Sequence, residues 1–195
     1  MKNAALIIFV RNPVLGKVKT RLAASMGDEK ALAVYKYLLQ HTRSISNDLR
    51  VKKFVFYADN INEDDLWNGF EKRLQTGNDL GQRMTNAFRE LFMDNFRTIC
   101  IIGSDCIELN TGILKDAFSA LKITDIVIGP AKDGGYYLMG MNSDFTNIFA
   151  KNEWGTNVVY KKTIAIIKKN KFTHTNLEIL NDVDTETDLP EGLII

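Results

Sequence analysis

Asp105 is the residue most strongly indicated for chemistry, because it directly follows a short uncharged segment. Residues 99–103 carry no charge and three of them are isoleucine, which is typical of a strand buried on both faces. In open α/β sheets, ligands bind outside the carboxyl ends of the strands. The alternative is that Asp105 caps the next helix, but Asn110 and Thr111 are better placed for that. The sequence therefore predicts a ligand site at Asp105 and the adjacent Ser104.

A basic segment lies between the first expected strand, residues 4–10, and the first expected helix. Lys17, Lys19 and Arg21 alternate along it after Gly16. Cations at a helix N-terminus oppose the helix dipole unless an anion is bound there, whereas the free N–H groups suit a phosphate. We therefore expect this segment, together with Arg11, to bind nucleotide phosphates. A solvated basic helix start is the alternative.

Two further loops carry weaker signals. Residues 75–84 contain two glycines, an amide and an arginine around the expected start of a helix. In a purely structural interpretation, Asn78 or Asp79 is the N-cap of that helix. In a functional interpretation this loop reads a base or a ribose, through Gln75, Gly77, Asp79 and Arg83.

The other loop contains Asp133, Gly134, Gly135 and Tyr136. A turn alone would account for the two glycines. In the functional interpretation, their missing side chains let a substrate approach the backbone, and Asp133 acts as a base or accepts a substrate hydroxyl.

The last candidate is the acidic turn at residues 181–185. Thr185 and Asp188 match a capping box, which leaves Asp184 outside the cap. If the turn folds back beside Asp105, the two carboxylates can share one Mg²⁺ or Mn²⁺, with water and substrate phosphates as the remaining ligands. Asp182 is the alternative to Asp184 as the second ligand.

Composition limits the function classes. A chain of 195 residues fits one domain spanning residues 1–195, and a net charge of +1 argues against nucleic-acid or anionic-membrane partners. The apolar segment 4–10 is too short to span a bilayer and precedes Arg11 rather than a cleavage site. Cys100 and Cys106 are too few for a zinc site, and their spacing argues against a disulfide. We expect a soluble cytoplasmic protein.

Strand and helix patterns alternate along the chain, which predicts a three-layer α/β domain with a mostly parallel sheet. The segment 136–141 follows residues 126–129 with no helix between them, so one strand should run antiparallel. Strands are expected at residues 4–10, 54–58, 73–76, 99–103, 126–129, 136–141 and 177–180. Helices are expected from about residue 19, with a break near residues 27–28, at 66–70, from 79, after 111 and at about 157–170.

Four of these stretches, residues 16–22, 103–106, 133–136 and 182–185, together resemble a bacterial family in the nucleotide-diphospho-sugar transferase superfamily. That family is similar to 2-phospho-L-lactate guanylyltransferase and, more distantly, to the molybdenum cofactor guanylyltransferase. The resemblance implies the glycosyltransferase-A fold with a mixed sheet of about seven strands. It also implies a nucleotide over the first loop and a metal at Asp105 and Asp184.

The leading hypothesis is metal-dependent nucleotidyl transfer from a nucleoside triphosphate to a small phosphorylated or hydroxyl acceptor. Lys17, Lys19 and Arg21 would neutralise the departing phosphates, and Asp105 and Asp184 would hold the metal. The alternative is glycosyl transfer from a nucleotide-diphospho-sugar with Asp133 as base. A third class is a nucleotide-binding protein without catalysis.

Overall fold

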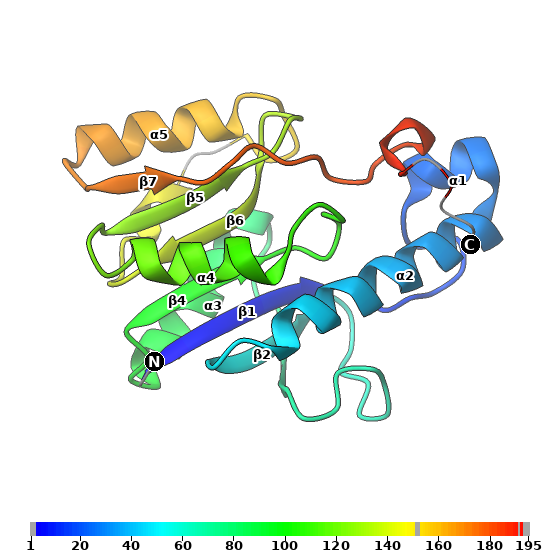
Figure 1. The fold of residues 1–195 in the computed structure, drawn as a ribbon, viewed down its shortest axis with the longest axis horizontal. Coiled ribbons are helices and arrows are strands. Elements are labelled where there is room, and N and C mark those ends of the chain that lie inside the picture. The colour runs from blue at the N-terminus through cyan, green and yellow to red at the C-terminus, as the bar shows by residue number, and fades with distance from the viewer. Residues whose placement is uncertain (1–2, 151–152, 191, 193–195) are drawn as a thin grey trace.

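The computed structural model describes residues 3–150, 153–190 and 192, and its centre is a seven-stranded mixed sheet. Figure 1 shows this sheet surrounded by helices. The strand order is β3-β2-β1-β4-β6-β5-β7, and β6 alone runs against its neighbours β4 and β5. The expected mostly parallel sheet and its antiparallel strand are therefore confirmed. The strands are β1 Ala4–Val10, β2 Lys52–Tyr57, β3 Glu71–Leu74, β4 Thr98–Ile102, β5 Ile126–Pro130, β6 Tyr136–Met141 and β7 His174–Asn176.

The centre of the sheet is apolar because its strands are covered on both faces. Ile7 pairs with Ile101 and Ile8 with Ile102, and these four side chains are at most 4% exposed. The register sets the ends of β1 and β4 side by side. Arg11 and Asp105, which follow those ends, consequently emerge at the same edge of the sheet.

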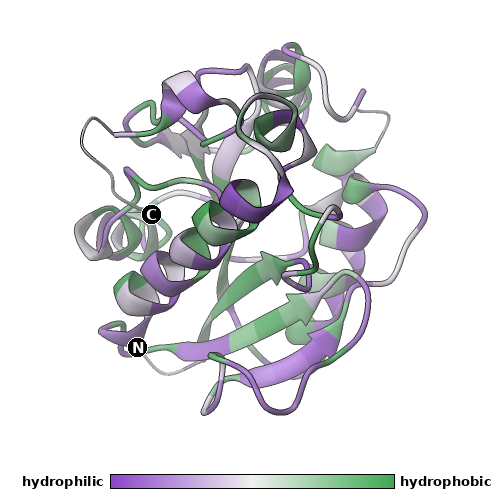
Figure 2. Ribbon diagram, turned by 90° about the vertical axis from the view of Figure 1, so that its right-hand side faces the viewer, coloured by the Kyte–Doolittle hydropathy of each residue, from purple (hydrophilic) through white to green (hydrophobic). Residues whose placement is uncertain are grey.

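Helices cover both faces of the sheet and form the two outer layers (Figure 1). One core cluster joins the sheet to α2 and α4, and a second joins it to α3 and α5. Apolar segments of the strands lie inside while polar segments of the helices face outward (Figure 2). The helices are α1 Thr20–Met26, α2 Asp28–Asn47, α3 Leu80–Met93, α4 Thr111–Ala120 and α5 Val159–Lys169, with short 3₁₀ helices η1 Thr146–Phe149 and η2 Glu186–Asp188.

The predicted helix boundaries follow local chemistry. Gly27, with φ of 88°, separates α1 from α2 and confirms the expected break, because L side chains rarely adopt that conformation. Asp79 caps α3 by accepting the N–H of Gln82, and Asn110 caps α4 by accepting the N–H of Ile113. These caps fix where each helix leaves the site edge of the sheet.

Two sequence-based assignments are wrong. The helix expected at residues 66–70 is a series of turns, because Trp67 is drawn into the core and Asp65 accepts its N–H. The last strand lies at His174–Asn176 rather than at 177–180, and within the latter segment only Leu180 makes an isolated bridge, to Ala131. At residues 66–70 the burial of Trp67 outweighs the local pattern. In the segment 177–180, by contrast, Ile179 is 63% exposed, so the apolar pattern there does not mark a buried strand.

The described residues contain no helix that is both long and apolar enough to cross a bilayer. Cys100 and Cys106 are both buried free thiols, as their spacing predicted.

Phe88 and Met93 of α3 offer a matched test of this core. Phe88 is fully buried and stacks on Phe92 and Phe149, whereas Met93 is 76% exposed. Phe88→Ala should lower the free energy of unfolding by about 3–5 kcal/mol, and Met93→Ala should change it by less than about 0.5 kcal/mol. Urea denaturation followed by circular dichroism measures both; equal losses would contradict the proposed packing.

Candidate active site

A cavity of about 740 Å³ opens at the edge of the sheet where β1 and β4 end. Its volume is in the range that accommodates a small-molecule ligand. Cations from the first loop and acids from the loops after β4 and β7 share its wall. The charged lining residues are Arg11, Lys17, Lys19, Arg21, Asp79, Arg83, Asp105, Asp182 and Asp184.

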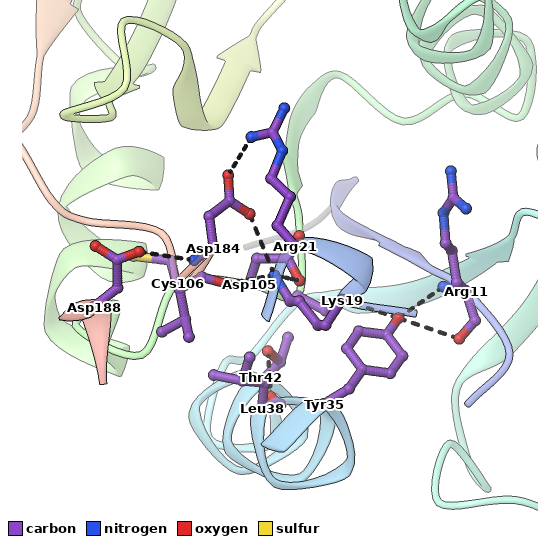
Figure 3. Close-up of polar contacts among 12 residues, drawn as sticks. Arg11, Lys19, Arg21, Tyr35, Leu38, Thr42, Asp105, Cys106, Asp184 and Asp188 are labelled. Atoms are coloured by element: carbon purple, nitrogen blue, oxygen red, sulfur yellow. Dashed lines mark hydrogen bonds and ion pairs between the residues drawn. The ribbon is translucent and has the colours of Figure 1, made fainter. Parts of the chain in front are cut away.

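The two predicted metal-binding acids converge on one lysine (Figure 3). Lys19 Nζ lies 2.9 Å from Asp105 Oδ1 and 3.7 Å from Asp184 Oδ1. It also donates a 2.7 Å hydrogen bond to the carbonyl of Val183. The Lys19 side chain is only 7% exposed, whereas those of Asp105 and Asp184 are 44% and 41% exposed. The convergence of Asp105 and Asp184, which the sequence left open, is therefore present.

Lys19 reaches this position through an unusual backbone conformation. It precedes the first residue of α1 with φ of 48° and ψ of 47°, the left-handed region. Such a conformation costs a non-glycine residue on the order of 1 kcal/mol, and it persists where surrounding contacts determine it. Here those contacts are the carboxylate of Asp105 and the carbonyl of Val183.

The acidic turn at residues 181–185 is fixed against the loop after β4 and against α1. The N–H of Val183 donates to the carbonyl of Asp105 at 2.9 Å, and Arg21 Nη1 donates to Asp184 Oδ2 at 3.2 Å. The predicted capping box of Thr185 and Asp188 is present at η2 and shapes the turn. Figure 1 shows this last segment lying beside α1, far from it in sequence.

Asp182 extends the acidic cluster. Partial burial raises its pKa to about 7, and the negative charges of Asp105, Asp133 and Asp184 add to that rise while Lys19 opposes it. Asp182 consequently keeps its proton to a higher pH than an exposed aspartate does. The sequence indicates Asp182 only through the paired acids of residues 182–184, as the alternative to Asp184 for the second metal ligand.

Tyr35 is a site residue that sequence reasoning missed, because it matches the apolar positions of α2. Its hydroxyl accepts the N–H of Arg11 at 2.9 Å, donates to the Arg11 carbonyl at 3.2 Å and lies 3.5 Å from Ser104 Oγ. Burial raises the pKa of Tyr35 to about 12, so the hydroxyl keeps its proton. Tyr35 thus holds the ends of β1 and β4 together beneath the cavity.

The loop predicted to read a base has its polar groups engaged with the backbone. Gln75 Nε2 donates to the carbonyls of Phe56 and Val10, and Arg83 Nε donates to the carbonyl of Gly77. Gln75, Asp79 and Arg83 line the cavity, and Gly77, with φ of 134°, does not. Gly77 instead makes the turn that lets Arg83 approach.

The loop of residues 133–136 divides into two parts. Tyr136 lines the cavity, whereas Asp133, Gly134 and Gly135 do not. A Cβ at Gly134, where φ is 90°, would lie 2.2 Å from the carbonyl oxygen of Asn157. Gly134 therefore makes room for the chain's own backbone. Asp133 Oδ1 accepts the N–H of Gly135, and its charge reaches Asp182.

The basic loop faces the cavity with all four of its cations, Arg11, Lys17, Lys19 and Arg21. Two of them already contact anions, since Lys19 binds Asp105 and Arg21 binds Asp184. Gly16, with φ of 72°, turns the loop and does not line the cavity. The protein's own carboxylates thus supply part of the negative charge that was expected beside these cations at the start of the helix.

The donor set fits a hard divalent cation bound with help from a substrate. Within the part of the chain that the structure describes, no group of three or more His, Cys, Asp or Glu side chains forms a complete metal site. Mg²⁺ commonly takes one or two carboxylates and completes its shell with water and phosphate oxygens. Asp105 and Asp184, each half-exposed to the cavity, provide such a pair.

Comparison with known proteins agrees with this architecture. The family model described as "Uncharacterized protein conserved in bacteria (DUF2064)" matches residues 41–156. The chain belongs to the DUF2064 family. A search of curated proteins finds no match.

Among solved structures, a candidate nucleotide-diphospho-sugar transferase of Desulfovibrio desulfuricans G20 is 30% identical to this DUF2064 protein. The match covers 98% of this chain and 90% of that one, with a TM-score of 0.87. The inositol-1-phosphate CTP transferase of T. maritima is 12% identical over 97% and 92% of the two chains, with a TM-score of 0.59. Rv0371c of Mycobacterium tuberculosis H37Rv, solved in complex with manganese, is 11% identical over 96% of each chain, with a TM-score of 0.59.

These structures confirm the predicted nucleotide-diphospho-sugar transferase fold, and the first and second are described as transferases, the enzyme class expected from the sequence. At 11% and 12% identity, the second and third comparisons establish the fold alone.

The acidic cluster predicts a pH effect on stability in metal-free buffer. Folded protein holds the Asp182 proton up to about pH 7, whereas the unfolded chain releases it near pH 3.8, so wild type should lose stability as the pH rises between these values. Asp182→Asn should remove this loss and exceed wild type at pH 8 by about 2–4 kcal/mol.

Urea denaturation between pH 4 and pH 8 measures the effect. Asp116→Asn, on the exposed face of α4, is the control and should follow wild type at every pH. A difference between Asp182→Asn and wild type that stays constant with pH would show that Asp182 is not the titrating group.

Proposed function

We propose that this DUF2064 protein is a metal-dependent nucleotidyltransferase that acts on a nucleoside triphosphate and a small acceptor. The supporting observation is the convergence of Asp105 and Asp184, together with the cations of the basic loop, in the lining of one cavity. A triphosphate needs carboxylates for its metal ion and cations for its oxygens, and both are within one pocket. The reaction joins an acceptor oxygen to the α-phosphorus while the bond to pyrophosphate breaks.

The cations would bind the phosphates that leave. Arg11, Lys17 and Arg21 are exposed on the cavity wall, and the Arg21 guanidinium can hold two oxygens at once. Tyr35 keeps Arg11 in place through its backbone. These cations line the cavity before the substrate arrives, and they can stabilise developing charge there once Arg21 exchanges Asp184 for phosphate oxygens.

Asp105 and Asp184 would hold Mg²⁺ or Mn²⁺, and Asp182 is the further carboxylate beside them. When bound, such an ion would offset the negative charge of the phosphates. Manganese in the structure of Rv0371c, which has the same fold, makes Mn²⁺ the natural first probe. In this chain the acid pair is half-exposed, so both carboxylates can reach a ligand in the cavity.

The positions proposed for the nucleobase and for the acceptor rest on fewer contacts. Gln75, Asp79 and Arg83 line the end of the cavity proposed for the nucleoside, and Tyr136 lines the side proposed for the acceptor. The sequence indicates neither the base nor the acceptor, so CTP, the nucleotide named for the T. maritima protein of the same fold, and GTP are the first triphosphates to test. Ser104 is 4% exposed and lies beneath the proposed phosphate position.

Pyrophosphate release tests the proposal. Wild type with Mg²⁺, a triphosphate and an acceptor should release pyrophosphate, and Asp105→Asn should lower kcat at least about 100-fold because one metal-binding charge is lost. Asp116→Asn is the matched control, since Asp116 is an exposed aspartate on α4 away from the cavity. Absence of turnover in a full panel of triphosphates and acceptors would contradict nucleotidyl transfer.

Glycosyl transfer is the second candidate, favoured by the D. desulfuricans relative described as a candidate nucleotide-diphospho-sugar transferase. The same acid pair would then hold the metal of a departing diphosphate. Asp133 was the base expected from the sequence, but it lies outside the cavity lining. Release of a nucleoside diphosphate in place of pyrophosphate identifies this reaction. A protein that only binds nucleotides would show ligand-induced stabilisation without either product.

A further inference from the structure

The Lys19 ammonium occupies the space between the two carboxylates proposed to bind the metal (Figure 3). We propose that Lys19 is the resident counterion of Asp105 and Asp184, and that it gives up Asp105 to a divalent cation and turns its ammonium toward the nucleotide phosphates. The inference rests on the proposed metal site. It assigns Lys19 two successive partners, carboxylates first and phosphate oxygens second.

The geometry allows Lys19 to leave Asp105 while it keeps another partner in the site. Nζ is held by Val183 and Asp105 at 2.7 and 2.9 Å, and less closely by Asp184 at 3.7 Å. The Val183 carbonyl is neutral and can remain a partner. The flexible four-carbon stem of lysine lets the ammonium swing while its backbone stays fixed at the start of α1.

Charge gives the reason for displacement. A divalent cation and the ammonium compete for Asp105 Oδ1, and the two positive groups repel each other at such short distances. Lys19 also lines the cavity beside Lys17 and Arg21, so its displaced ammonium remains in the wall proposed for phosphates. Metal and nucleotide binding are thereby coupled, because both ligands favour the displaced position of the Lys19 ammonium.

Lys72 provides a matched control elsewhere in the molecule. Its side chain is 8% exposed, compared with 7% for Lys19. It lies 3.0 Å from Asp65 Oδ1 and donates to the carbonyls of Asn62 and Glu63. Lys72 therefore has the same kinds of partner as Lys19, but it does not line the cavity.

Brief acetylation with an N-hydroxysuccinimide ester, read by mass spectrometry, tests the displacement in wild-type protein. Without metal, Lys19 and Lys72 should both label slowly, and exposed Lys17 should label fast. Saturating Mn²⁺, at matched ionic strength and without nucleotide, should raise Lys19 labelling at least about fivefold and leave Lys72 unchanged. Added nucleotide should then protect Lys19 again. Unchanged Lys19 labelling while calorimetry records Mn²⁺ binding would overturn the proposal.

Calorimetry with Mn²⁺ alone gives a second readout. Lys19→Met removes the competing charge and should tighten Mn²⁺ binding about tenfold, whereas Lys72→Met should leave it unchanged. Weaker binding by Lys19→Met would contradict competition and indicate that Lys19 only holds the acids in place. Because labelling uses wild-type protein, a variant that fails to fold does not remove the test.

The outcomes separate this inference from the proposed reaction. Metal-dependent release of Lys19 without any pyrophosphate formation would support the inference and refute nucleotidyl transfer. Pyrophosphate formation with Lys19 labelling unaffected by metal would do the reverse. Failure of wild type to bind Mn²⁺ by calorimetry, with or without a triphosphate, would overturn both the proposed metal site and the displacement.

Discussion

The ion pairs of Lys19 are the interaction on which the site depends, because they join three segments that are far apart in sequence. Lys19 belongs to the loop after β1, Asp105 to the loop after β4, and Asp184 to the turn that follows β7. The sheet brings the first two together through the parallel register of β1 and β4. The last turn is not a strand of the sheet. Its Val183 backbone is hydrogen-bonded to Lys19 and Asp105, and its Asp184 is ion-paired with Arg21. The acidic turn is thus part of the site through these polar contacts and through the burial of Val183 against Leu22 and Leu38, rather than through the sheet.

Polar contacts of this kind explain why the fold was easier to predict than the site. Strands such as β4 and β6 carry a dense apolar pattern and follow their sequence signals closely, and Gly27, Asp79 and Asn110 mark helix ends by local chemistry. The segment 66–70 looked helical because its apolar spacing cannot distinguish a helix from a turn that buries Trp67. The convergence of Asp105 and Asp184 depends on long-range contacts that no local pattern contains.

Residue identity also left the partners of the basic loop open. The alternating cations predicted an anion, and the structure supplies two carboxylates in addition to an open cavity. Tyr35 was indistinguishable from the other apolar positions of α2, although its hydroxyl holds the backbone of Arg11. Gly134 suggested room for a substrate, but the space belongs to the backbone of Asn157. For the cations and for Gly134, the residue type indicated an anion or a close approach of another group, and only the fold determined which group that is.

The charge balance of the cluster connects the architecture to the chemistry. Burial and the negative charges of Asp105, Asp133 and Asp184 raise the pKa of Asp182 to about 7, even though Lys19 opposes the rise. A site built only for stability would gain little from a third carboxylate, since a buried charge without a partner is costly. The clustered carboxylates have a physical use if a divalent cation enters with the substrate. The strained backbone of Lys19 fits the same interpretation, because it aims the ammonium at the oxygens that such an ion would take over.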